Sequence, residues 1–131
     1  MNRWLTPQLI DHVARFVLAV IFLFYGFNYF LGWLPWPDMP LEAIMFLDAL
    51  QKVGYLFPVV FSIQLLGGVL LLLNRFVPLA IVMLAPIVIN IVLFHGFLNP
   101  GDGYMAVLLA VLLIILTNHH RQAFTGVFKF K

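Results

Sequence analysis

The sequence contains no cysteine and very little charge. Of its 131 residues only 9% are charged and 64% are hydrophobic, whereas a soluble domain has about 25% charged and about 45–50% apolar residues. The absence of cysteine excludes disulfides, thiol redox chemistry, thiolate metal sites and iron–sulfur clusters held by this chain. The formal net charge of +2 is too small to indicate a nucleic-acid partner. The composition predicts a single membrane domain, with no room for a separate soluble one.

A catalytic constellation is also lacking. The sequence has no Ser/His/Asp arrangement and no glycine-rich phosphate loop, and its aspartates and glutamates lie outside the predicted spans. A proton relay or a cation-coupled transporter is expected to bury a carboxylate within a span, so both are disfavoured. His119 and His120 are adjacent, and adjacent residues of a helix do not share a face, so we expect no metal site there. The sequence therefore favours a protein that is not an enzyme.

What the sequence does contain is a series of apolar segments, each close to the ~20 residues that a span requires. We expect four transmembrane helices, at about 13–31, 56–73, 76–94 and 104–117. A helix at about 41–53 has apolar residues at helical spacing with charges among them, which predicts a position in the membrane interface. The predicted fold is an all-α membrane protein: a four-transmembrane-helix bundle with a short interfacial helix between its first two spans.

The basic residues gather on one side of the predicted spans. That side carries six of the seven lysines and arginines: Arg3, Arg15, Arg75, Arg121, Lys129 and Lys131. The opposite side carries Lys52 and four of the five acidic residues. Because basic loops stay in the cytoplasm, we expect a multi-pass protein of the plasma membrane with both termini cytoplasmic.

A few polar side chains lie within or beside the spans, from the middle of the bilayer to its outer rim. The candidates for a ligand pocket between the first three spans are Tyr25, Asn28, Tyr29, Gln64, Asn90 and His95. A second interpretation remains open for each of them, namely a hydrogen bond or a packing contact that only holds the helices together.

Four further residues are predicted to have structural roles. Arg15 lies at the inner rim of the bilayer. Its guanidinium is expected to reach either the lipid headgroups or the inside of the bundle. Gly67 and Gly68 allow a neighbouring helix to approach closely. Pro86 interrupts the third span and predicts a kink that opens the candidate pocket.

Three stretches of the chain form a specific combination. They are Arg15 with FLFYGFNYFLGWLP in the first span, GYLFP before the second, and QLLGGVLLLLNRFVPLAIVMLAPIVINIVLFHGFLNPGDG through the third. Together they resemble the DoxX-like family of small bacterial membrane proteins. The resemblance implies a compact four-helix bundle in the bacterial inner membrane. It also implies a link to sulfur or quinone redox systems for some members, and protein-assembly roles for distant eukaryotic relatives.

The chain departs from the family pattern at two positions. The family often has a lysine where this chain has Tyr29, and a glutamate where it has Gln64. Since removing one partner of a buried ion pair costs about 3–5 kcal/mol, the two changes are consistent with each other. A neutral tyrosine–amide contact is the expected replacement, and chemistry that requires a charged lysine or glutamate at these positions is not expected of this chain.

Three functions are compatible with these residues. The first, which we favour, is a binding or accessory module for a small apolar ligand, a quinone or a lipid, or for a membrane protein partner, including a second copy of the chain. The second is the membrane subunit of a sulfur or quinone oxidoreductase, whose electron carrier must be a ligand or a partner because the chain lacks cysteine. The third is an assembly factor for other membrane proteins. No cofactor other than a quinone is indicated.

Overall fold

The computed structural model describes residues 6–127, and this part of the chain is helical without any strand. Its long helices are α1 (Pro7–Leu31), α3 (Leu56–Leu73), α4 (Val77–Phe97) and α5 (Tyr104–His119), and α2 (Leu41–Lys52) is shorter. Two 3-10 turns complete it, η1 (Pro100–Asp102) and η2 (Arg121–Phe124). Three of the basic residues that indicated the orientation, Arg3, Lys129 and Lys131, lie outside the described range.

The four helices α1, α3, α4 and α5 form a ring. The most extensive contact joins α1 and α3. α3 also packs against α4, α4 against α5, and α5 against α1, which closes the ring. α1, α3 and α4 have the length and hydropathy of membrane spans, and α5 is a shorter apolar helix of 16 residues. The predicted all-α membrane bundle is therefore confirmed.

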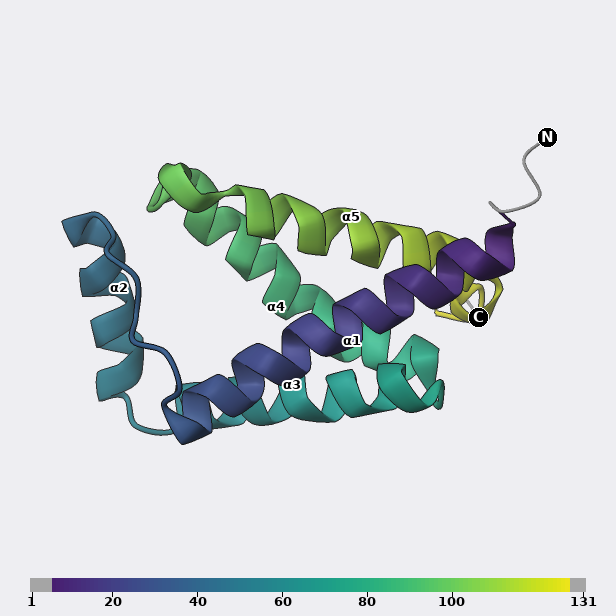
Figure 1. Cartoon of the computed structure of the whole chain (residues 1–131), viewed down its shortest axis with the longest axis horizontal. Helices are drawn as coiled ribbons and strands as arrows, with labels where there is room; N and C mark the ends of the chain where they lie inside the picture. Colours follow the sequence, from purple (N-terminus) through teal and green to yellow (C-terminus); the bar gives the residue numbers. More distant parts are fainter. Residues whose placement is uncertain (1–5, 128–131) are drawn as a thin grey trace.

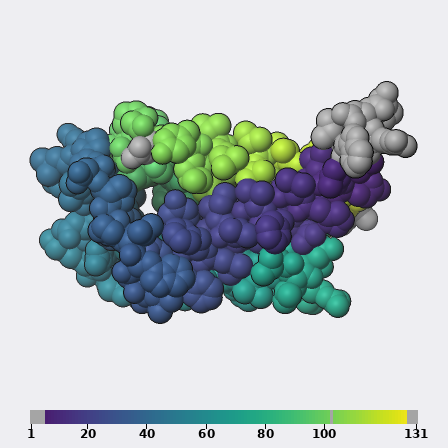
Figure 2. Space-filling model, viewed as in Figure 1, coloured from purple at the N-terminus to yellow at the C-terminus, as the bar shows by residue number. Residues whose placement is uncertain are grey.

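The pair α1–α3 and the pair α4–α5 diverge toward one end, and α2 lies across that opening (Figure 1). α2 touches both sides of it, since it packs on α3 and its Phe46 ring lies 5.8 Å from Phe94 of α4. The surface is hollowed between α2, α1 and the segment that joins α4 to α5 (Figure 2). We call this half of the bundle the α2 half. The opposite half, which contains Asp11 and His120, is the histidine half.

The apolar core lies in the histidine half. Its fully or nearly fully buried members come from the first two thirds of α1, the last turn of α3, the first half of α4 and the second half of α5. The largest of them are Phe22, Leu18, Leu71, Leu84 and Leu116. The α2 half buries far fewer apolar side chains, and its buried positions include the polar residues Gln64 and Asn99.

Two glycines of α3 bring its neighbours close. A Cβ on Gly67 would lie 2.8 Å from the Leu84 side chain of α4, and a Cβ on Gly68 would lie 2.9 Å from Leu23 of α1. Any larger side chain would push these helices apart, because membrane helices associate mainly by close van der Waals packing.

The first span begins earlier than the hydrophobicity predicts. α1 begins at Pro7 rather than near residue 13, because the Thr6 hydroxyl accepts a hydrogen bond from the Leu9 N–H at 3.1 Å and Pro7 suits the first helical position. Asp11 therefore lies within the first membrane helix, although the sequence places every carboxylate outside the predicted spans. At the other end of the chain, α5 continues to His119 instead of ending near residue 117.

Candidate functional site

Two of the predicted pocket residues lie at the interface of α1 and α3. The Tyr29 ring stacks on Phe61, with ring centroids 4.3 Å apart and planes 7° apart, and Phe57 meets it edge-on at 6.0 Å. Gln64, one turn further along α3, is 5% exposed and belongs to the buried stripe that continues through Gly67 and Gly68. Gln64 thus belongs to the buried face of α3, one turn from Phe61.

None of the side-chain hydrogen bonds of the described chain links Gln64 to Tyr29, and the Gln64 amide is not among the buried polar atoms that lack a partner there. The predicted tyrosine–amide contact is therefore not among the hydrogen bonds of the described chain. What Tyr29 contacts instead is the phenyl ring one turn from the amide.

The other four candidates lie apart from this pair. Asn28 accepts a hydrogen bond from the Leu34 N–H at 2.7 Å, which holds the loop after α1. The His95 Nδ1 lies 2.9 Å from the Ile91 carbonyl of its own helix, and α4 stays helical through Phe97. Two further candidates, Tyr25 and Asn90, are exposed on the outside of the bundle. Their positions suit contacts with lipid or a partner better than a shared pocket.

The residues assigned structural roles are placed as follows. Arg15 reaches into the bundle, where its Nη1 donates to the Leu71 carbonyl at 2.7 Å and its Nη2 lies 2.8 Å from the His12 Nδ1. Its Nε is buried without a partner in the described chain. Pro86 lies inside α4 on an exposed face. Of the two alternatives for Arg15, the structure shows the inward one.

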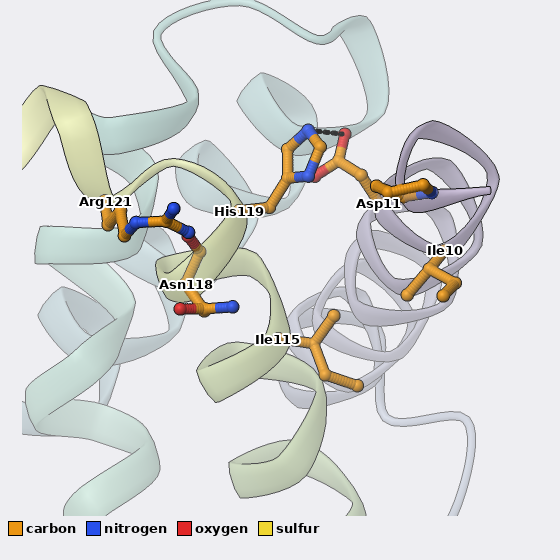
Figure 3. A pocket seen from close by; sticks show the side chains of 7 residues that line it. Ile10, Asp11, Ile115, Asn118, His119 and Arg121 are labelled. Atoms are coloured by element: carbon orange, nitrogen blue, oxygen red, sulfur yellow. Dashed lines mark hydrogen bonds and ion pairs between the residues drawn. The ribbon is translucent and has the colours of Figure 1, made fainter.

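A cavity of about 330 Å³ opens between the start of α1 and the end of α5 (Figure 3). Apolar side chains, among them Ile10 and Ile115, form part of its wall, and Asp11, Asn118 and His119 supply polar groups. A second cavity of about 410 Å³ lies between α4 and η2 and is lined mainly by apolar groups. Both cavities lie in the histidine half.

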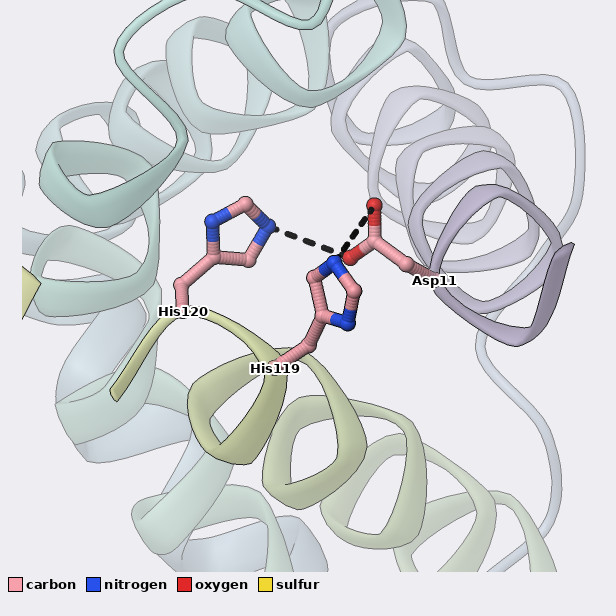
Figure 4. A group of neighbouring side chains, drawn as sticks. All are labelled: Asp11, His119 and His120. Carbon is pink, nitrogen blue, oxygen red and sulfur yellow. Dashed lines mark hydrogen bonds and ion pairs between the residues drawn. The ribbon is translucent and has the colours of Figure 1, made fainter. Parts of the chain in front are cut away.

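Asp11 is 5% exposed and faces two imidazoles (Figure 4). The His120 Nε2 lies 3.1 Å from its Oδ1, and the His119 Nε2 lies 4.0 Å from its Oδ2. The adjacent rings converge because α5 ends at His119, and His120 leaves the helical path with φ −101° and ψ 20°. The rule that adjacent residues do not share a helix face applies only where the helix continues.

The chain is similar to a known protein family over its first four helices. The family model described as DoxX matches residues 10–97, which is more than half of the chain. The chain belongs to the DoxX family. No curated protein and no solved structure matches it. The DoxX match runs from α1 through α4 and so includes Asp11, Tyr29 and Gln64, whereas α5 with His119 and His120 lies beyond it.

The burial of Asp11 could have been predicted from the sequence of this DoxX protein by one additional step. Asp11, Ala14, Leu18 and Phe22 fall on one stripe of a helix and are all buried. If the helix is predicted to begin at the Thr6–Pro7 pair, its only acidic residue, Asp11, falls on the apolar face. The convergence with His120, 109 positions later, could not have been deduced, because it depends on how α1 and α5 pack.

Proposed function

We propose that this DoxX-family protein is a binding module of the plasma membrane that holds a small apolar molecule with a polar group, a quinone or a lipid, in its α2 half. The observation that carries the proposal is Gln64, an amide side chain that is 5% exposed on the inward face of an apolar helix, one turn from the stacked rings of Tyr29 and Phe61. A binding pocket typically combines apolar and aromatic walls with a few polar groups that orient the ligand.

The chemistry of these residues suits a quinone or a lipid ester. The Gln64 side chain offers an N–H donor to a carbonyl oxygen of the ligand, and the Tyr29 and Phe61 rings offer flat apolar faces. The divergence of α4 and α5 from α1 and α3, with α2 across the opening, supports entry at this end (Figure 1). The hollow in the surface lies on the same side (Figure 2).

The binding test uses the purified chain in lipid nanodiscs and a short-chain benzoquinone as the probe. Quenching of tryptophan fluorescence reports binding, since Trp36 lies 6.1 Å from Phe57 in the α2 half. Gln64→Leu is expected to weaken binding about tenfold, the equivalent of one hydrogen bond of about 1–1.5 kcal/mol. Gln122→Leu is the matched control because Gln122 is exposed in the histidine half.

Native mass spectrometry of the same sample identifies a co-purified quinone or lipid. A bundle that carries neither, together with equal quenching in the wild type and in Gln64→Leu, would contradict the proposal. A redox role as an oxidoreductase subunit would use the same ligand. It additionally requires co-purification with an electron-donating partner, because the chain contains no cysteine.

One observation favours a membrane protein partner, or a second copy of the chain, that binds to the exposed face of α4. Asn90 is exposed in the apolar helix α4, among the exposed side chains of Ile89 and Leu93. An amide at membrane depth is most stable when it is hydrogen-bonded across a helix interface. A role in assembling other membrane proteins would use this face.

Both termini are proposed to be cytoplasmic. The absence of cysteine makes a direct test simple, since Lys52→Cys and Arg75→Cys each introduce a single thiol at an exposed position. A membrane-impermeant maleimide is expected to label Lys52→Cys in intact cells and Arg75→Cys only after permeabilisation. The opposite pattern would reverse the orientation.

A further inference from the structure

We propose that Asp11, His119 and His120 bind a divalent transition-metal ion, such as Zn²⁺, that joins the start of α1 to the end of α5. The three side chains each offer one ligand atom, and these atoms all lie within 4.8 Å of one another (Figure 4). Two imidazole nitrogens and one carboxylate oxygen form a common ligand set for catalytic zinc and for ferrous iron.

The distances require only small side-chain rotations. Ligand atoms around tetrahedral zinc, with bonds of about 2.0–2.2 Å, lie about 3.3 Å apart. The His120 Nε2 to Asp11 Oδ1 distance is already 3.1 Å, and the His119 Nε2 lies 4.0 Å from the other carboxylate oxygen. Both nitrogens belong to rings at the very end of a helix, where rotation of the rings does not disturb the bundle.

The cluster is also accessible, and within the described chain neither Arg15 nor Arg121 pairs with its carboxylate. Asp11 and His119 line the cavity of about 330 Å³ between α1 and α5, so an ion and its remaining water ligand can enter (Figure 3). Neither nearby guanidinium holds the carboxylate. Arg15 bonds the Leu71 carbonyl and His12, and Arg121 donates to the Asn118 carbonyl at 3.2 Å.

A metal ion also accounts for an aspartate buried in a membrane helix. Burying a carboxylate is costly unless the carboxylate is paired or coordinates a metal. A neutral imidazole can donate a hydrogen bond to the carboxylate but offsets its negative charge only as an imidazolium, whereas a bound divalent ion offsets the charge with both imidazoles neutral. The competing interpretation is therefore a simple carboxylate–imidazolium pair, and the experiment must separate the two.

The test uses the full chain purified without a histidine tag, stripped with a chelator and titrated with ZnCl₂ and CoCl₂ in nanodiscs. One Zn²⁺ is expected to bind per chain, with a rise of several degrees in the thermal midpoint. Co²⁺ is expected to give the visible absorption bands of a low-symmetry site with nitrogen and oxygen ligands. Mg²⁺ should compete poorly, because it prefers oxygen ligands.

The variants Asp11→Asn, His119→Gln and His120→Gln should each weaken Zn²⁺ binding by more than about tenfold, since even the outer partners of metal ligands account for about 10–100-fold. His119→Gln is the most informative of them, because His119 is exposed and its replacement should leave the bundle folded. His12→Gln, one residue from Asp11 but outside the cluster, is the matched control and should bind as the wild type does.

Equal Zn²⁺ affinity in the wild type and in His119→Gln, or a wild-type chain that shows neither a thermal shift nor cobalt bands, would overturn the proposal. The second of these results would leave the carboxylate–imidazolium pair as the account of the cluster. Neither result depends on the quinone or lipid site of the α2 half, which is tested separately through Gln64.

Discussion

In the histidine half, apolar side chains from α1, α3, α4 and α5 meet around Leu84 and Leu116, which are fully buried. In the α2 half the same four helices diverge, and the buried positions include Gln64 and Asn99 (Figure 1). The aromatic contacts between helices and loops, such as Tyr29 with Phe61 and Phe46 with Phe94, belong to this second half.

The difference follows from how helices associate in a bilayer. Lipid tails are as apolar as leucine, so burying apolar surface gives little driving force and close packing supplies the stability. The small and branched side chains of the histidine half, with Ala19 and Ala80 fully buried between helices, meet that requirement. The α2 half buries fewer apolar side chains and meets that requirement less fully.

The largest expected effect comes from a matched pair of leucines in α4. Leu84 is 0% exposed and Leu93 is 50% exposed. Leu84→Ala should destabilise the bundle by about 2–5 kcal/mol through the cavity that it leaves, and Leu93→Ala should cost far less because lipid fills the space. Unfolding of both variants in detergent, followed by circular dichroism, measures the difference. Equal losses would mean that Leu93 is covered as fully as Leu84, which would contradict the exposed position of Leu93 in the α2 half.

Arg15→Met tests whether the histidine half depends on its polar contacts as well as its core. The substitution removes the hydrogen bond from Nη1 to the Leu71 carbonyl. Hydrogen bonds to charged groups contribute about 1.5–3 kcal/mol, although the loss of the unpartnered Nε offsets part of this. We expect a net destabilisation at the lower end of that range. His12→Gln, which keeps the Leu71 contact, serves as the control, and no change in Arg15→Met would contradict the assignment.

Gln64→Leu should change binding more than it changes stability. Leucine is close to glutamine in size, so the stability of the empty bundle should change by less than about 1.5 kcal/mol, while the quinone probe should bind about tenfold more weakly. A loss of binding with little change in stability would separate the binding half from the packing half. A larger loss of stability would indicate that the amide holds the helices together instead of orienting a ligand.

Much of this contrast was accessible from the sequence, and the reason is physical. The spacing of Gln64, Gly67 and Gly68 is local to one helix, so their common face could be predicted and is buried in the structure. The four-helix membrane bundle follows from composition and apolar segments, since a bilayer leaves few other solutions. The start of α1 could not be predicted as well, because a capping hydroxyl at Thr6 outweighs hydrophobicity there.

What the sequence could not supply are contacts across the bundle. Asn28 was predicted to face a neighbouring helix or a ligand, yet it bonds the backbone of Leu34 in the loop that follows its own helix. The approach of Asp11 to His120 depends on the packing of α1 against α5 and on the exact residue at which α5 ends. Neither contact produces a periodic pattern in the sequence from which it could be predicted.

The smallest expected effect on stability is that of Asn90→Leu. This substitution tests what contacts the outer surface of the α2 half, not what binds inside it. Asn90 is exposed, so the stability of the isolated bundle should change by no more than about 0.5 kcal/mol. If the amide holds a partner or a second copy, the substitution should instead lower the fraction of cross-linked oligomer in native membranes, with Ile89→Leu as the control. Unchanged cross-linking would leave lipid as the neighbour of this face, because an amide that bonds across an interface cannot be replaced by leucine without loss.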